Sequence, residues 1–117
     1  MIRRNDEIRA DVYERRFGGE GTVTTRHLLN GAEEMYGKGR LFAHGTIEPG
    51  SSLGYHVHEG ESETFYILRG IGEYNDDGIV STVKAGDVTF TLAGQGHGMK
   101  NAGQEPLEYI ALILFKE

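Results

Sequence analysis

An all-β fold is predicted from three features of the 117-residue sequence. Glycine is abundant and proline is rare, with 18 and 2 residues respectively. Valine, isoleucine, threonine, tyrosine and phenylalanine occur in short groups, which are typical of strands joined by tight turns. About eight or nine such groups follow one another, with a turn signal every ~8–12 residues. This is the pattern of a two-sheet sandwich or a small barrel, and the length suits one domain.

The strand candidates follow a charged N-terminal arm. In residues 1–21 we expect at most one or two helical turns, around 6–16, and a negligible core. We divide the chain into this arm and its continuation, 1–40, and a barrel domain, 41–117. The strand candidates are Thr22–Leu29, Leu41–Ile47, Tyr55–His58, Thr64–Leu68, Gly72–Tyr74, Ile79–Val83, Val88–Leu92 and Leu107–Phe115. The last is the most apolar, so we expect it at the centre of a sheet.

Turn chemistry separates these candidates. Glu48-Pro49-Gly50 ends one strand, because proline presets φ and glycine accepts a positive φ. Asn75-Asp76-Asp77-Gly78 predicts a hairpin, and Lys84-Ala85-Gly86-Asp87 predicts the next turn. A loop with glycines at 94, 96 and 98 precedes the final strand.

Composition excludes several classes of function. The net charge of −6 is a poor match for a phosphate backbone, so we expect no nucleic-acid partner. The absence of cysteine excludes thiol catalysis, disulfides and thiolate metal sites. No segment approaches the roughly 18 apolar residues of a membrane span, and the N-terminus lacks the apolar run of a secretory signal. We therefore expect no membrane partner and a cytoplasmic location.

A candidate metal site begins in the stretch YHVHEGESE, residues 55–63. His56 and His58 are two positions apart and share a face if the segment is extended. Glu63 follows His58 at an odd offset, so the chain has to turn between them. Gly60 allows that turn, and Glu63 then returns to face the histidines. We interpret Glu59 and Glu61 mainly as solvated residues of this turn.

His97 is the candidate for a fourth ligand, in a glycine-rich segment on a separate hairpin. Three imidazoles and one carboxylate suit one divalent transition metal, namely Mn, Fe, Co, Ni, Cu or Zn, because Ca and Mg prefer oxygen ligands. A six-coordinate ion would keep two positions open for water, dioxygen or a bidentate small molecule.

A small-molecule pocket is expected beside these residues. Phe65 and Ile67 share the strand face of Glu63, Met99 shares the parity of His97, and Tyr109 lies on the predicted central strand. Apolar walls with a few convergent polar groups are typical of ligand pockets. The four residues are our predicted substrate-binding pocket.

These spacings resemble the cupin family. Its first motif is matched by Gly50, His56, His58, Glu63 and Gly70, and its second by Gly86, Gly94, His97 and Asn101. Leu92 replaces the proline of the second motif, which affects the rigidity of a turn and no ligand. The match covers about 41–115.

The resemblance implies a jelly-roll barrel whose metal is bound by His56, His58, Glu63 and His97. It also implies a homodimer, with Thr22–Leu29 as the candidate exchange strand. Small cupins include oxalate-decarboxylase-like proteins, dioxygenases and sugar isomerases, so family and ligands do not determine the substrate.

Three functions remain open from the sequence. The first is a metal-dependent enzyme acting on a small carboxylated or polyhydroxylated metabolite, of the decarboxylase, dioxygenase or isomerase type. The second is a non-catalytic cupin that binds or senses such a molecule, and the third is a metal that only reinforces the barrel. No catalytic acid or base is identified. Arg40 and Arg69 are the arginines available near the motif strands to hold a second carboxylate. His44 is interpreted as structural or exposed, and His27 as a dimer contact or an exposed residue.

Overall fold

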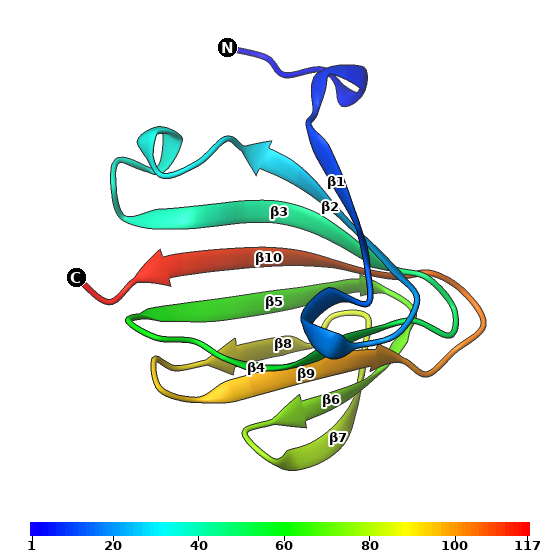
Figure 1. The fold of residues 1–117 in the computed structure, drawn as a ribbon. Coiled ribbons are helices and arrows are strands. Elements are labelled where there is room, and N and C mark those ends of the chain that lie inside the picture. Colours follow the sequence, from blue (N-terminus) through cyan, green and yellow to red (C-terminus); the bar gives the residue numbers. More distant parts are fainter.

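Alternating burial along the long strands requires two layers. The computed structural model describes residues 1–117. In β5 (Glu61–Arg69) and β10 (Leu107–Phe115), side chains alternate between buried and more exposed positions. A strand with one apolar face needs another layer to cover it, and two antiparallel sheets meet for this purpose (Figure 1). The all-β prediction is confirmed.

The two sheets contain six and four strands. The larger sheet has the order β1-β2-β3-β10-β5-β8, with β1 (Ala10–Glu14), β2 (Thr22–Leu29), β3 (Gly39–Ile47) and β8 (Val88–Thr91) beside the two long strands. The smaller sheet has the order β4-β9-β6-β7, formed by β4 (Ser52–Val57), β9 (Gly96–Asn101), β6 (Ile71–Asp76) and β7 (Ile79–Lys84). Three short 3₁₀ turns are η1 (Asn5–Glu7), η2 (Arg16–Gly18) and η3 (Glu33–Met35).

The central position predicted for Leu107–Phe115 is confirmed, because β10 pairs with β3 on one side and β5 on the other. The predicted hairpin is also present. It joins β6 to β7, with positive φ at Asp77 and Gly78. A buried cluster fills the space between the sheets: Val23, Ile47, Leu53, Phe65, Ile67, Tyr74, Val83, Met99, Leu107, Tyr109 and Ala111.

The N-terminal segment differs from the expectation. The prediction of helical turns around 6–16 is wrong for the middle of that range. Residues 10–14 form β1 and pair antiparallel with β2. The segment is charged and lacks a helical apolar stripe, but strand pairing needs only backbone groups, which it supplies to the sheet edge. Residues 16–18 then form η2 next to β4.

The candidate exchange strand is engaged on both edges within its own chain. β2 pairs with β1 on one side and with β3 on the other. The homodimer, the division at residue 40 and the cytoplasmic location stay predictions. No helix in the structure has the length and apolar character needed to cross a membrane.

Candidate metal centre and ligand cavity

The four predicted ligands come together from both sheets. His56 lies in β4 and pairs in register with His97 of β9, and His58 lies in the turn that follows β4. Glu63 lies on β5 in the facing sheet. One potential ligand atom from each of the four residues lies within 4.8 Å of all the others. His56 and His97 are 41 positions apart in the sequence, yet they belong to one cluster. Its imidazole and carboxylate groups are of the kind that hold a transition metal.

The turn between His58 and Glu63 is shorter than expected. Gly60 has a positive φ of 70°, as the prediction required, but β5 already begins at Glu61. Glu61 and Glu63 are therefore alternate residues of one strand and share its buried face. The interpretation of Glu61 as a solvated turn residue is wrong, whereas Glu59 is exposed as expected.

Each imidazole has an outer hydrogen-bond partner at Nδ1. His56 Nδ1 donates to the carbonyl of Gly54 at 2.8 Å, and His58 Nδ1 donates to the Glu61 carboxylate at 2.7 Å. His97 Nδ1 lies 2.7 Å from the Tyr74 hydroxyl. Because the carbonyl and the carboxylate only accept, they fix the Nδ1 proton and leave Nε2 of these two rings as the atom available to a metal.

The spacing of the donor atoms fits a shared cation. Nε2 of His58 and Nε2 of His97 are 3.1 Å apart, and each lies 2.9 Å from Oε1 of Glu63. Donors held at about 2.1 Å from one ion lie about 3 Å from one another when they are adjacent in its shell. Two nitrogen lone pairs and a carboxylate repel at this separation unless a proton or a metal ion lies between them. The chemistry and spacing of these residues therefore fit the metal that the sequence predicts.

Local charge keeps the carboxylate of this cluster ionised. Burial would raise the pKa of Glu63, but its hydrogen-bonding contacts with His58 and His97 outweigh it and lower that pKa to about 2. The Glu63 hydrogen bond raises the pKa of His58, and burial lowers the pKa of His56. The cluster therefore carries one fixed negative charge that attracts a cation.

A cavity of about 190 Å³ adjoins the cluster. Its lining includes His56, His58 and Glu63, together with Phe65 and Tyr109 from the predicted pocket. The other two predicted pocket residues, Ile67 and Met99, lie outside the lining. They are almost fully buried in the core between the sheets. The alternation of side chains along a strand correctly predicted that Ile67 and Met99 point inward. It cannot predict how far the cavity extends along the barrel.

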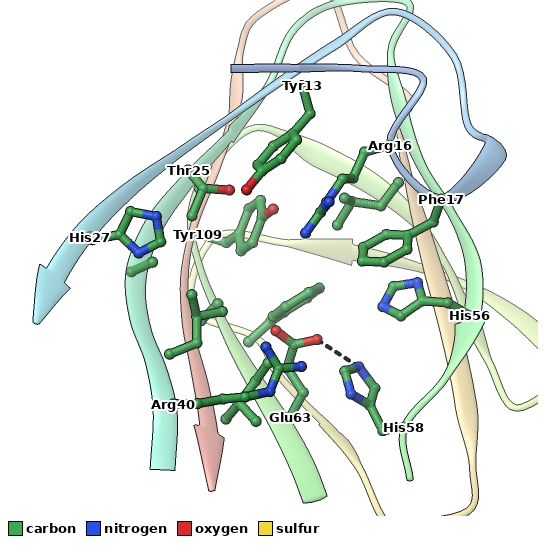
Figure 2. A pocket seen from close by; sticks show the side chains of 17 residues that line it. Tyr13, Arg16, Phe17, Thr25, His27, Arg40, His56, His58, Glu63 and Tyr109 are labelled. Carbon is green, nitrogen blue, oxygen red and sulfur yellow. Dashed lines mark ion pairs between the residues drawn. The ribbon is translucent and has the colours of Figure 1, made fainter. Parts of the chain in front are cut away.

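The N-terminal segment closes one end of this cavity, which the sequence did not indicate. Tyr13, Arg16 and Phe17 belong to the lining, and Figure 2 shows them beside Tyr109 and His56. The ring of Phe17 stacks on the ring of His56, with centroids 3.8 Å apart and planes 17° apart. The one local signal was the glycine pair at 18–19, which permits a close backbone approach.

Glu61 connects the candidate ligand His58 to an arginine. Its carboxylate accepts two hydrogen bonds from Arg40, from Nε at 2.7 Å and Nη2 at 2.6 Å, as well as the bond from His58. The Arg40 hydrogen bonds lower the pKa of Glu61, which keeps it an acceptor. Arg40 lines the cavity but is already paired, so it is poorly suited to hold a second carboxylate of a ligand.

Replacing Glu61 with glutamine is expected to weaken metal binding about 10- to 100-fold, the usual cost of losing an outer partner of a ligand histidine. The amide keeps the shape but loses the charge that orients Nδ1 of His58. Competition with a chelating dye measures the affinity. Glu59→Gln is the matched control, since Glu59 is exposed in the same turn; equal affinities in both variants would show that Glu61 does not position the site.

The other histidines and the second arginine considered in the sequence analysis each lie close to an acidic side chain. His27 lines the cavity and pairs with Asp11 at 2.8 Å, and His44 pairs with Glu108 at 2.9 Å. Arg69 lies at the exposed barrel edge, 3.5 Å from Glu108, and is not part of the lining.

Comparisons with known proteins agree with this geometry. Residues 43–113 match the model of the family described as "Cupin domain". The chain is 45% identical over 114 residues to an "Oxalate-binding protein" of Thermotoga maritima, covering 97% of this chain and 93% of that one.

Solved structures give the same fold. A crystal structure described as a predicted oxalate decarboxylase, also from Thermotoga maritima, matches with a TM-score of 0.92 and 44% identity over 98% of this chain and 99% of that chain. An uncharacterised protein with a double-stranded β-helix domain from Klebsiella pneumoniae matches with a TM-score of 0.61 and 31% identity, over 66% and 68% of the two chains. The jelly-roll prediction is thereby confirmed.

Proposed function

The chain belongs to the cupin domain family, and from this premise we propose that it binds a small dicarboxylate in a metal-dependent manner, with oxalate as the first candidate. The observation that carries the proposal is that three of the four clustered donors, His56, His58 and Glu63, line a small cavity, with His97 directly behind them. A relative that shares 45% identity bears the name "Oxalate-binding protein".

His56, His58, Glu63 and His97 would hold the metal. A divalent transition metal bound there supplies a Lewis acid with positions open to oxygen ligands. The cavity side of the cluster is the side from which a ligand can reach those positions, because Nδ1 of each imidazole is engaged outward. The metal identity stays open among Mn, Fe, Co, Ni, Cu and Zn.

The rest of the cavity suits a small anion. Its volume of about 190 Å³ lies below the roughly 300 Å³ at which pockets for drug-sized ligands begin. Burial raises the pKa of Tyr109, so its hydroxyl keeps its proton. Tyr109, Tyr13 and Thr25 thus offer hydroxyl donors to a carboxylate, while Phe65 and Leu41 exclude water.

Binding takes precedence over turnover because the cavity offers no carboxylic acid that is free of other partners. Decarboxylation needs a group that delivers a proton to the reacting carbon. The carboxylate in the lining is Glu63, which the metal would occupy, and Glu61 is paired with Arg40. Metal-dependent decarboxylation, dioxygenation or isomerisation remains the alternative, as the sequence suggested.

Calorimetric titration of oxalate into Mn²⁺-loaded and chelator-treated protein tests the proposal. We expect saturable binding with the metal present and at least tenfold weaker binding after its removal. Equal affinity in both forms would contradict a metal-dependent ligand site. Assay of the same mixtures for carbon dioxide and formate distinguishes binding alone from decarboxylation.

A further inference from the structure

Arg16 is the one cavity-lining cation without an acidic partner in the chain. Of the other basic residues in the lining, Arg40 is paired with Glu61, His27 with Asp11, and His58 with Glu61 and Glu63. The fourth, His56, is a candidate metal ligand whose Nδ1 bonds the Gly54 carbonyl and whose burial disfavours the charged form. No carboxylate lies within ion-pair distance of Arg16, and no hydrogen bond satisfies its guanidinium. A half-buried guanidinium with free N–H groups at a cavity wall is suited to bind a carboxylate through two parallel hydrogen bonds.

Two aromatic faces hold this guanidinium in place. Its central carbon lies 3.8 Å from the ring centroid of Tyr13 and 4.3 Å from that of Phe17. Contacts of this kind engage the flat faces of a guanidinium and leave its edge donors available. In Figure 2 the side chain of Arg16 enters the cavity from the N-terminal segment, on the side away from Arg40 and His58.

The turn that carries Arg16 is anchored to the wall that carries the metal cluster. Phe17 stacks on His56, and the backbone at Phe17 and Gly19 packs directly against Gly54 of β4. Arg15 and Phe17 both have a positive φ, near 55°. Non-glycine residues rarely adopt this conformation unless their surroundings impose it. The arginine is therefore preorganised before a ligand enters.

We propose that Arg16 is the residue that selects a dianionic ligand, by binding the carboxylate oxygens that point away from His56, His58, Glu63 and His97. This inference rests on the proposed function and adds its selectivity. The metal cluster accepts any small oxygen ligand, whereas Arg16 adds a charge-assisted contact that only an anionic second group makes in full. The chemical class is a short dicarboxylate.

The test compares oxalate with oxamate, which has the same shape but a neutral amide in place of one carboxylate. Both are titrated into Mn²⁺-loaded wild type, Arg16→Gln and Arg15→Gln. Arg15 is the matched control because it lies in the same turn, is exposed and is absent from the cavity lining. Manganese content and melting temperature are recorded for every protein.

We expect Arg16→Gln to keep its manganese, to bind oxalate about 10- to 100-fold more weakly, and to lose most of the preference for oxalate over oxamate. Arg15→Gln should bind both ligands within about twofold of the wild type, since Arg15 is exposed outside the cavity and its charge is screened by salt. Arg16→Lys, which keeps the charge without the planar fork, should lose less than Arg16→Gln.

Unchanged oxalate affinity in Arg16→Gln would overturn the role of Arg16 and leave metal-dependent binding intact. Equal losses in Arg15→Gln and Arg16→Gln would also overturn it, because net charge alone would then explain the effect. Failure of the metal-loaded wild type to bind oxalate at all would instead overturn the proposed function and, with it, this inference.

Discussion

Replacing Glu63 with glutamine is expected to weaken metal binding by at least about 100-fold, more than the loss of an outer hydrogen-bond partner costs. Glu63 is the only charged donor in the cluster, and its Oε1 lies 2.9 Å from Nε2 of both His58 and His97. Glutamine preserves the volume but removes the anion, so the cluster no longer attracts a cation. Titration of apo protein with Mn²⁺ against a competing chelator measures the change.

The matched control is Glu73→Gln, an exposed acid on β6. It removes the same charge from the chain and should leave metal affinity within about twofold, because an exposed distant charge is screened by salt. Circular dichroism should show both variants folded. Metal affinity of Glu63→Gln equal to that of the control would show that Glu63 is not a ligand.

Substituting Gly54 with alanine is expected to detach η2 from the barrel wall. The new Cβ would lie 1.9 Å from the carbonyl oxygen of Phe17 and 2.8 Å from the backbone nitrogen of Gly19. Backbone atoms cannot rotate away as a side chain does, so the turn has to move and Arg16 with it. We expect a loss of about 1–3 kcal/mol, a melting temperature lower by about 5–10 °C, and at least tenfold weaker oxalate binding.

Gly103→Ala is the control for this substitution, because its Cβ would meet nothing closer than 3.7 Å. It should change neither oxalate binding nor stability by more than ordinary surface substitutions do. Scanning calorimetry and oxalate titration of the two variants provide the comparison. A Gly54→Ala protein that melts with the wild type and binds oxalate normally would contradict the packing of the N-terminal turn on β4.

Local pattern was sufficient to find the four residues that the structure groups as candidate ligands, and to find most strands. His56 and His58 alternate with Val57, which defines their common face, and the turn at Gly60 brings Glu63 back toward them. His97 follows from the glycine-rich spacing of the second motif. The continuous apolar run of β10 indicated a strand with neighbours on both sides, which the pairing with β3 and β5 confirms.

The residues that sequence reasoning missed depend on contacts between distant segments. Arg16 reaches the cavity only because β1 pairs with the edge of β2. Such pairing uses backbone groups, so the order of side chains in the sequence does not reveal it. Glu61 was assigned to a turn because the predicted strand begins at Thr64, three residues after the true start of β5. Its partner Arg40 is 21 residues away on another strand. Ile67 and Met99 have the correct parity but lie beyond the depth of the cavity.

Elemental analysis of protein purified without an affinity tag, reconstituted with Mn²⁺ and freed of unbound ions, tests the four-residue metal centre most directly. We predict close to one bound ion per wild-type chain and almost none in Glu63→Gln or in a His58→Ala, His97→Ala double variant that remains folded. A wild type that retains no ion, or variants that retain as much as the wild type, would contradict the assignment of the metal to His56, His58, Glu63 and His97.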